Sequence, residues 1–451
     1  MSAARYDLIV IGSGAAGEQA ALSAAERHLR VGVAALPGGG LSAKILREAV
    51  LHLSGGNRQT LEGIHRRIRE KVTLAELTQC VQAAVKSEGE ASRALLRQSG
   101  VEVFQGAARF VGPHSVCVAA AAGESIVDAD RILIATGARS AASPLAPING
   151  RSIVTSEQIL DMTELPHTLL VVGGGVVGVE CACLFALLGV HVTLVEQLDR
   201  LLPFADREMV EALAAHLREN RVSLRLGETV ESVEVLPLGT VVANLASKRR
   251  VSADALLWAV GRQANSAQLN LDAAGVSTGS DGRITVNSNF QSSVDHIYAA
   301  GDVAGFPTLE ATAMEQGRIA AARASGDHAA LSNPCFYPSV LYTVPEIAFA
   351  GKTQEQLTAE NVPFRVVVAN FRETARGLQR GDSAGRLKLL FHGESRKVLG
   401  IHILGEGASE LLHLGQAVMA LGGTVDYFTH AVFNSHSLAE GYKAAVRNAA
   451  G

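Results

Sequence analysis

The chain has 451 residues, of which 48% are hydrophobic and 19% charged, and its net charge at pH 7 is −4. This composition is typical of a compact globular protein with about two to four domains, and it excludes a disordered chain. The small negative charge gives no electrostatic reason to expect nucleic acid as a partner. Five scattered cysteines do not suit a disulfide framework. Without a signal peptide or a long apolar stretch in the sequence, we expect a cytoplasmic protein that does not span a membrane.

A glycine-rich turn follows the first predicted strand. Residues 8–11 are an apolar run that suits a buried parallel strand, and an Ala-rich, helix-favouring segment begins at Glu18. Between them, Gly12, Gly14 and Gly17 have the spacing GxGxxG. This spacing permits a tight turn, close approach of a pyrophosphate and close packing of helix on strand, with the phosphates at the positive end of the helix. The motif alone is weak evidence, but with its strand and helix it predicts a dinucleotide site.

The second strand of this unit is expected over residues 29–36. In dinucleotide-binding folds this strand normally ends in an acidic residue that binds the adenosine ribose. The corresponding position, 23 residues after Gly12, is Ala35, so the first site lacks that anchor. A helix is expected over residues 41–53, and for the basic residues 58–71 we favour an exposed helix face over a phosphate or partner contact. Downstream we expect a helix over residues 73–96 and strands over residues 101–110 and 131–137.

The opening pattern is repeated in the middle of the chain. Residues 169–172 are apolar, and Gly173, Gly175 and Gly178 again have the spacing GxGxxG before a predicted helix. The second strand of this copy ends in Glu196, 23 residues after Gly173, so the acidic residue is present here. Two such units predict two bound dinucleotides and electron transfer between them.

Glu196 also indicates which coenzyme the second unit binds. Its carboxylate can accept both hydroxyls of an unmodified ribose and would repel a 2′-phosphate, so NAD(H) is favoured. Arg200, four residues later, weakens this preference without reversing it, which leaves NADP(H) open.

The last part of the chain, residues 333–451, contains no third glycine fingerprint. It is predicted to be a separate α+β domain, for which an interface role is the natural interpretation. No cluster of His, Cys or carboxylate residues has metal-ligand spacing, so no metal is expected. The predicted strands are residues 365–370, 386–391 and 398–404, and the predicted helices are residues 408–420 and 425–431.

Several segments together resemble the FAD-dependent pyridine nucleotide-disulfide oxidoreductases (class I), which include dihydrolipoamide dehydrogenase and glutathione reductase. Within this family the chain is most similar to the soluble pyridine nucleotide transhydrogenase branch. The resemblance covers almost the whole chain, and its ordered series of motifs is far more specific than any one of them. The motifs are GSGAAGEQAA at Gly12, RILIATGARS at Arg131, GGGVVGVECA at Gly173, VGRQANS at Val260, YAAGDVAGF at Tyr298, YTVPEIAFAGKT at Tyr342, GRLKLLFHGE at Gly385 and FNSHSLAEGY at Phe433.

The resemblance implies an α/β fold with two Rossmann-like dinucleotide-binding domains, one for FAD and one for NAD, and a C-terminal α+β dimerisation domain. It therefore implies a homodimer. The implied boundaries are an FAD domain over residues 1–150 and 280–332, an NAD(P) domain over residues 151–279 and a dimerisation domain over residues 333–451.

The resemblance also implies roles for individual residues. Lys44 and Glu180 match a pair beside the flavin N5, where hydride passes. A cation there would favour the reduced, anionic flavin, and the carboxylate would keep the lysine charged. The alternative is an ordinary ion pair at a helix end. Gly12, Gly14, Gly17, Thr136, Gly137 and Asp302 would bind FAD, Gly173, Gly175, Gly178 and Glu196 would bind NAD(H), and Ala15, Lys44, Gly261, Arg262 and Gly301 are further implied cofactor contacts.

The chain departs from the disulfide-reducing members at the redox centre. Those members carry a CxxxxC pair before the lysine, whereas here Gly40 is followed by Leu-Ser-Ala and then Lys44, with a loop about six residues shorter. Chemistry by thiolate attack on a disulfide is therefore not expected. Cys181 and Cys183 cannot replace the pair, because residues two apart on a helix point to different faces, and we expect them to be core residues.

The C-terminal base is also altered. Aligning FNSHSLAE on Glu440 puts Ser435 at the position of the family's catalytic histidine and His436 at that of the following proline. His436 and Glu440 can still share a helix face at positions i and i+4, so a proton-shuttling His436 is one interpretation and a surface or packing histidine is the favoured one.

These features predict an FAD-dependent NAD(P)H oxidoreductase that passes hydride from NADH through the flavin to a non-disulfide acceptor. The expected form is a transhydrogenase or a diaphorase/quinone reductase, and the sequence does not name the small-molecule acceptor. Ala35 and the short loop motivate the alternative, a non-catalytic NAD(H)-binding relative that acts as a binding or assembly subunit.

Overall fold

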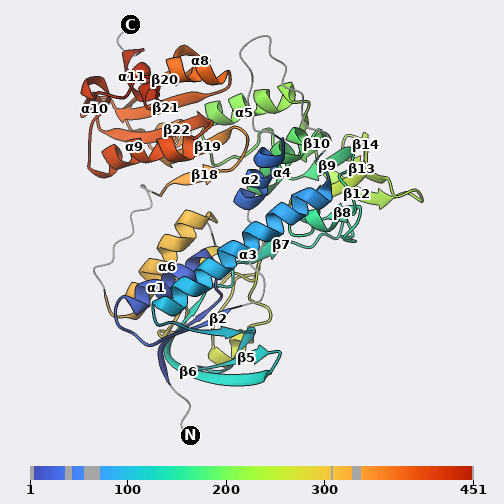
Figure 1. Ribbon diagram of the computed structural model, residues 1–451, viewed down its shortest axis with the longest axis vertical. Coiled ribbons are helices and arrows are strands. Elements are labelled where there is room, and N and C mark those ends of the chain that lie inside the picture. Colours follow the sequence, from blue (N-terminus) through green and yellow to red (C-terminus); the bar gives the residue numbers. More distant parts are fainter. Residues whose placement is uncertain (1–4, 36–42, 55–71, 306–307, 328–336, 449–451) are drawn as a thin grey trace. The chain divides into compact units, whose positions relative to one another are not determined.

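The computed structural model describes residues 5–35, 43–54, 72–305, 308–327 and 337–448 (Figure 1). The chain forms two compact units, each built from three segments: residues 1–40, 83–141 and 261–333 in the first, and residues 41–82, 142–260 and 334–451 in the second. The basic segment over residues 58–71 lies outside the described residues. In the described part of the chain, no helix is long and apolar enough to cross a bilayer.

The first unit is built around a central strand, β1 (Tyr6–Ile11). β1 is almost wholly buried because it pairs in parallel on both sides, with β2 (Val31–Ala35) and with β6 (Gly123–Ile134). β3 (Glu102–Gln105) extends the sheet beyond β2, and β17 (Ile297–Ala299) extends it beyond β6. The predicted Rossmann-like α/β arrangement is confirmed in this unit.

β6 belongs to two layers of the first unit. Its second half pairs in parallel with β1, whereas its first half pairs antiparallel with β5 (Ser115–Ala120), which in turn pairs with β4 (Ala107–Gly112). The single strand predicted over residues 101–110 is wrong, because Gly106 interrupts it with a φ of +159°. A Cβ at Gly106 would lie 2.3 Å from the carbonyl oxygen of Ala119, so only glycine fits there.

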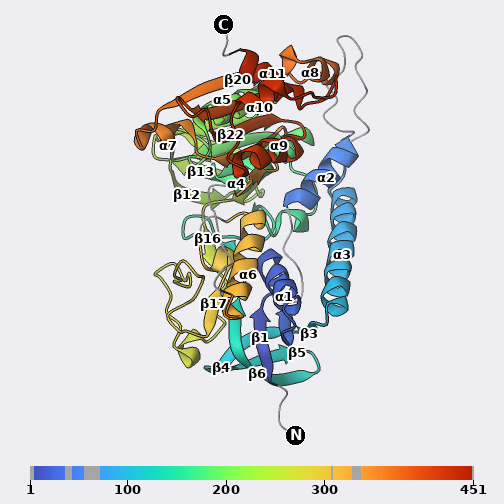
Figure 2. The same cartoon turned by 90° about the vertical axis from the view of Figure 1, so that its left-hand side faces the viewer.

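Two helices of the first unit, α1 (Ala15–Ala25) and α6 (Glu310–Ala324), lie side by side in both views (Figures 1 and 2). Their backbones are close because Gly317 faces α1, and a Cβ there would lie 2.0 Å from the carbonyl oxygen of Ala16. The helix predicted over residues 73–96 is confirmed as α3 (Leu74–Gln98). The remaining elements are the antiparallel pair β7 (Ala138–Ser140) and β16 (Arg262–Ala264) and the 3-10 turns Leu271–Ala274 and Gly301–Val303.

The second unit contains its own parallel sheet, in the order β11-β10-β9-β15-β8. α4 (Val176–Leu187) follows the central strand β9, and α2 (Ala43–Ser54) packs against α4. This sheet repeats the βαβ pattern of the first unit, as the repeated glycine spacing predicted. The strands are β8 (Ile153–Val154), β9 (Thr168–Val172), β10 (His191–Glu196), β11 (Ser223–Leu226) and β15 (Ala255–Trp258); α5 (Arg207–Glu219) and the antiparallel strands β12 (Val230–Val235), β13 (Val241–Leu245) and β14 (Arg250–Ala253) complete this part.

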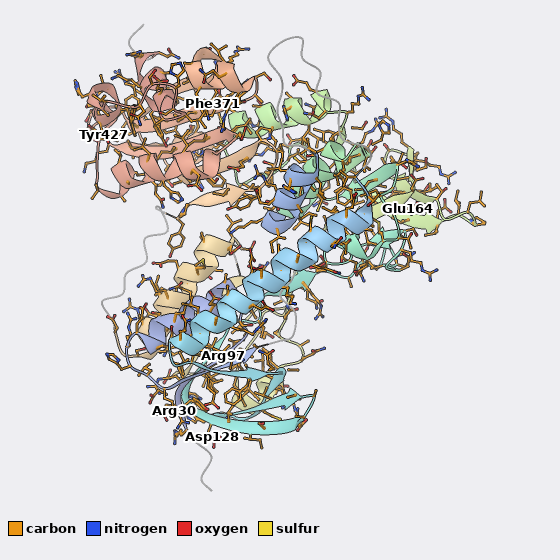
Figure 3. All side chains as sticks on the ribbon, viewed as in Figure 1. Arg30, Arg97, Asp128, Glu164, Phe371 and Tyr427 are labelled. Atoms are coloured by element: carbon orange, nitrogen blue, oxygen red, sulfur yellow. The ribbon has the colours of Figure 1, made fainter. Side chains whose placement is uncertain are left out.

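The C-terminal part of the second unit is an antiparallel sheet in the order β18-β19-β22-β21-β20. Figure 3 shows Phe371 among these elements, where its side chain is fully buried, whereas Tyr427 lies at the edge and is 48% exposed. The predicted α+β character of this part is confirmed. The strands are β18 (Ser339–Leu341), β19 (Glu346–Gly351), β20 (Phe364–Asn370), β21 (Arg386–His392) and β22 (Val398–Gly405), and the helices are α7 (Gln354–Ala359), α8 (Ala375–Arg380), α9 (Ala408–Ala420), α10 (Asp426–His430) and α11 (Glu440–Arg447).

Candidate functional site

The first glycine turn joins β1 to α1 in the first unit. Gly12 has a φ of +110°, and a Cβ there would lie 2.3 Å from the carbonyl oxygen of Ala135. A Cβ at Gly17 would lie 2.0 Å from the carbonyl oxygen of Gly12, so helix and turn are in close contact. Gly14 is different, because it is the N-cap of α1, has no side chain to cap the helix, and would place a Cβ in open space. The N-terminus of α1 is therefore not capped by a side chain of Gly14, and an anion can approach beside this residue.

Other predicted cofactor contacts lie in the same unit. The hydroxyl of Thr136 donates to the carbonyl of Asn265 at 2.8 Å, and the Asn265 side-chain amide donates to the carbonyl of Thr136 at 3.0 Å. Gly137 follows with a φ of +69°. Gly301, with a φ of +78°, donates its N–H to the buried side-chain oxygen of Gln316 at 2.8 Å. Asn265 and Gln316 were missed as individual residues in the sequence, because nothing in their local pattern marks them as partners of these turns.

Asp302 and Arg262 are brought together in the first unit. Arg262 Nε lies 3.4 Å from Asp302 Oδ2, and its Nη2 donates to the carbonyl of Ala138 at 2.5 Å. Arg262 Nε is buried, and its contact with Asp302 is an ion pair that lacks hydrogen-bond geometry. Gly261 precedes it with a φ of +80°. At the end of β2, Ala35 is 5% exposed and offers no carboxylate to a ribose.

These residues fit a dinucleotide in the first unit. The open space at the Gly14 N-cap admits a bound phosphate, and the ion pair of Arg262 and Asp302 offers charged groups in the same unit. The missing carboxylate at Ala35 removes one ribose contact but leaves the phosphate end of the site intact.

The second glycine turn joins β9 to α4 and has the same geometry as the first. Gly173 has a φ of +111°, and a Cβ there would lie 2.6 Å from the carbonyl oxygen of Ala259. A Cβ at Gly178 would lie 1.9 Å from the carbonyl oxygen of Gly173, whereas one at Gly175, the N-cap of α4, would meet no atom within 4 Å. The residues again fit a dinucleotide whose pyrophosphate lies at the helix N-terminus.

Glu196 lies at the end of β10, beside this second turn. Its two carboxylate oxygens accept the N–H of Gly174 at 2.5 Å and the N–H of Leu198 at 2.8 Å. These amides fix the carboxylate, and each oxygen keeps a further lone pair for a ribose hydroxyl. Arg200 donates to the carbonyl of Pro203, so its guanidinium is held by its own loop.

Lys44 and Glu180 both lie in the second unit, Lys44 in the first turn of α2 and Glu180 on α4. Glu180 is 5% exposed, and one oxygen accepts the N–H of Tyr342 at 2.7 Å. Burial raises the pKa of Glu180 to about 7, and the Tyr342 amide and the charges of Arg47 and Lys44 limit this rise. Lys44 Nζ lies over the ring of Tyr342, 5.2 Å from its centroid. Glu180 can therefore exchange a proton near neutral pH.

A buried arginine next to this pair was missed in the sequence. Arg47, one helical turn after Lys44, is 6% exposed, and its Nη2 binds Glu346 Oε1 at 2.9 Å. Its Nε donates to the carbonyl of Thr343 at 3.3 Å, and its Nη1 binds Glu48 at 2.7 Å. The only available signal was an arginine on the apolar face of a predicted helix, where arginines are rare unless paired.

The cysteines of α4 are core residues, as predicted. Cys181 and Cys183 are 6% and 3% exposed. Burial raises the pKa of both thiols, that of Cys183 to about 12, so neither is a thiolate at neutral pH. In the described part of the chain the four cysteines are free, and no group of three or more His, Cys, Asp or Glu side chains is arranged to hold a metal.

The suggestion that His436 and Glu440 share a helix face is wrong. α11 begins at Glu440, and His436 lies before it in a turn with a φ of +63°. The Glu440 carboxylate instead accepts the backbone N–H of His436 at 3.1 Å, and Ser435 Oγ lies 2.8 Å from the ring Nδ1 of His436. The ring is thus oriented by the hydroxyl of Ser435.

Comparison with known families agrees with this geometry. The sequence pattern of the family described as "Pyridine nucleotide-disulphide oxidoreductase" matches residues 6–322, and that of the family's dimerisation domain matches residues 337–446. The first match includes both glycine turns, Lys44 and Glu180, and the second includes α9, α10 and all but the last residue of α11. Members of this family use FAD and NAD(P)H, in agreement with the two dinucleotide sites.

Individual relatives match over nearly their full length. The soluble pyridine nucleotide transhydrogenase of Mycobacterium tuberculosis is 42% identical over 449 residues, which cover 97% of this chain and 96% of the relative. The transhydrogenase of Pectobacterium atrosepticum is 37% identical, with 98% and 97% covered. Among solved structures, LpdA from Mycobacterium tuberculosis superposes with a TM-score of 0.89 at 29% identity, with 98% and 99% covered. The chain therefore belongs to the pyridine nucleotide-disulphide oxidoreductase family, whose members are FAD- and NAD(P)H-dependent oxidoreductases.

Proposed function

We propose that the protein oxidises NADH through bound FAD and passes the electrons to a second pyridine nucleotide, as a soluble transhydrogenase. The observation that carries the proposal is the pair of glycine turns, in a chain 42% identical to a transhydrogenase and without a cysteine before Cys80. FAD, when bound, supplies a two-electron hydride acceptor. Transfer to a nicotinamide moves hydride alone, whereas reduction of a quinone also consumes a proton. Diaphorase or quinone-reductase activity is the related alternative.

We assign the following roles to individual residues. Gly12, Gly14, Ala15 and Gly17 bind the FAD pyrophosphate, and Gly173, Gly175 and Gly178 bind that of NAD(H). Glu196 selects the ribose, while Lys44 and Glu180 provide the charges at the reacting end. The further proposed cofactor contacts are Thr136, Gly137, Gly261, Arg262, Gly301 and Asp302. A catalytic role has the least support for His436 and Glu440, since the Glu440 carboxylate accepts the backbone N–H of His436 and does not contact its ring through that bond.

The domain organisation in this proposal is an FAD domain over residues 1–150 and 280–332, an NAD(P) domain over residues 151–279 and a dimerisation domain over residues 333–451. The match of residues 337–446 to the family's dimerisation domain supports a homodimer. The buried, reduced thiols of Cys181 and Cys183 suit a reducing cytoplasm.

The experiment that tests the proposal begins with the absorption spectrum of the purified protein. We expect a flavin spectrum that NADH bleaches without oxygen, followed by recovery when an NADP⁺ analogue is added. Glutathione disulfide and lipoamide are expected to give no recovery, because no cysteine pair precedes Lys44. A colourless protein that FAD cannot reconstitute would instead favour an NAD(H)-binding subunit, for which Ala35 is the motivating residue.

Coenzyme choice provides a second prediction. In Glu196→Gln, the ratio of kcat/KM for NADH to that for NADPH is expected to fall by about tenfold or more, because the charge that repels a 2′-phosphate is removed. Steady-state kinetics with both coenzymes measure this ratio. Glu231→Gln, which removes an exposed carboxylate paired with Lys248, is the matched control and should leave the ratio unchanged. An unchanged ratio in Glu196→Gln would remove Glu196 from the ribose site.

A further inference from the structure

The loop over residues 342–346 lies in the second unit and contacts two groups of charged side chains, the Lys44 and Glu180 pair and Arg47. On one side, the N–H of Tyr342 donates to Glu180 at 2.7 Å, and the ring of Tyr342 lies beneath Lys44. On the other side, Arg47 binds the carbonyl of Thr343 and the carboxylate of Glu346. The loop therefore joins Arg47 to both members of the Lys44 and Glu180 pair.

Arg47 is held more firmly than a surface arginine. Its side chain and that of its partner Glu346 are 8% and 7% exposed. The other oxygen of Glu346 accepts the N–H of Ser409, in the first turn of α9, at 2.9 Å. The Glu346 carboxylate therefore makes charge-assisted hydrogen bonds to both the helix amide and the guanidinium, which makes it a strong partner for Arg47. Only the planar fork of arginine can bind this carboxylate and the Thr343 carbonyl together.

We propose that Arg47 is a positioning residue of the hydride-transfer site: it fixes the loop over residues 342–346, so that Tyr342 presents its N–H to Glu180 and its ring to Lys44. Arg47 does not need to touch the reacting atoms for this role. The inference rests on the proposed function, because it assigns Lys44 and Glu180 to that site.

The charge of Arg47 has a second consequence for Glu180. Arg47 and Lys44 oppose the rise in the pKa of Glu180 that burial causes, so loss of Arg47 raises the pKa above its value of about 7. Two further titratable groups lie near Glu180 on α4. Burial keeps the thiols of Cys181 and Cys183 protonated, so they do not titrate in the same range.

The test compares Arg47→Gln with Arg47→Lys in the holoenzyme. We expect Arg47→Gln to slow the reduction of bound flavin by NADH about 100-fold, as a displacement of about 1 Å can do, and to move the midpoint of its pH profile upward. Arg47→Lys keeps the charge but cannot bridge both acceptors. It should therefore restore the pH midpoint while the reduction stays about tenfold slow. Stopped-flow absorbance at several pH values measures both quantities.

Two further variants control for stability and for shared action. Arg396→Gln removes an arginine that binds Asp426 through three hydrogen bonds of 2.6 to 3.0 Å, and it should leave flavin reduction unchanged. Glu346→Gln should slow reduction as Arg47→Gln does, and the double variant should be no slower than either single one. Additive losses, wild-type kinetics in Arg47→Gln, full recovery in Arg47→Lys or an equal loss in Arg396→Gln would each overturn the proposal.

A readout that does not depend on flavin reduction separates this inference from the proposed function. In the protein as purified, the infrared band of the protonated Glu180 carboxyl, identified by its absence in Glu180→Gln, should titrate at a higher pH in Arg47→Gln than in the wild type. If NADH fails to bleach the wild-type flavin, the proposed function fails, while this titration still measures whether Arg47 acts on Glu180. An unshifted titration overturns the action of Arg47 on Glu180 whatever the enzyme does.

Discussion

Gly178→Ala is expected to weaken NAD⁺ binding by about 100-fold while the protein keeps its bound FAD. The added methyl group would lie 1.9 Å from the carbonyl oxygen of Gly173, so the start of α4 must move away from β9. This displacement moves the helix amides that we propose bind the pyrophosphate. Titration of NAD⁺ by calorimetry measures the affinity, and the flavin spectrum reports the first unit in the same sample.

Gly175→Ala is the matched control for this variant. Gly175 lies three residues earlier in the same turn, yet a Cβ there meets no atom of the protein within 4 Å. The methyl group should therefore leave the thermal unfolding temperature unchanged and weaken NAD⁺ only by crowding the bound pyrophosphate. The reciprocal variant, Gly17→Ala, should lose FAD and retain NAD⁺ binding. If Gly178→Ala bound NAD⁺ as the wild type does, the second turn would not be the nucleotide site.

Lys388→Met is expected to lower the free energy of unfolding by about 3–5 kcal/mol. Lys388 is 1% exposed, and its ammonium group binds Asp206 at 3.0 Å, Glu208 at 3.1 Å and the side-chain oxygen of Gln354 at 2.8 Å. Asp206 is the N-cap of α5 and is 1% exposed, so removal of the lysine leaves a buried carboxylate without its cation. Urea denaturation followed by circular dichroism measures the loss.

Two variants test this explanation of the loss. Asp206→Asn combined with Lys388→Met removes the unpaired charge and keeps a good N-cap, so much of the stability should return. Lys248→Met removes an exposed lysine paired with Glu231 and should change stability by less than about 0.5 kcal/mol. A loss in the double variant equal to that in Lys388→Met alone would show that packing, and not the stranded carboxylate, causes the effect.

The same pair predicts how stability depends on pH. Burial raises the pKa of Asp206, but the charges of His402 and Lys388 more than offset this, so its pKa lies below the ordinary value. Burial lowers the pKa of His402, so at neutral pH Lys388 is the cation that acts. A depressed carboxyl pKa stabilises the fold above the unfolded value and loses that stabilisation as the pH falls through the folded value. Acid unfolding below about pH 4 should therefore include this loss in the wild type and less of it in Lys388→Met, where His402 remains as a charge that lowers the pKa of Asp206.

The sequence predicted best where a local pattern determines the structure. The strand, glycine turn and helix at Gly12 and again at Gly173 follow from apolar runs and glycine spacing within about thirty residues. The apolar pattern also located α9 and the central strands of each sheet. Even the interruption at Gly106 had a local signal, because an isolated glycine within a predicted strand indicates a break or a bulge.

The residues that were missed depend on partners far away in the sequence. Arg47 is buried only because Thr343 and Glu346, about 300 positions later, bind it. Lys388 can be buried because it is paired with Asp206, the residue that caps α5 elsewhere in the second unit. For His436, the spacing to Glu440 was correct, but the helix begins only at Glu440, and nothing in the local pattern fixed that start. Side chains whose hydrogen-bond or ion-pair partners are far away in the sequence do not produce a periodic pattern in the sequence.

Strand β6, which belongs to both layers of the first unit, affects how this unit unfolds locally. Its first half is hydrogen-bonded to β5 and its second half to β1 and β17, so the antiparallel layer cannot peel away without disturbing the strand beside the first glycine turn. Amide protons of residues 131–134 should accordingly be among the last to exchange with deuterated solvent. A backbone cut in the β5–β6 hairpin would leave both layers paired, whereas one in the middle of β6 would separate them.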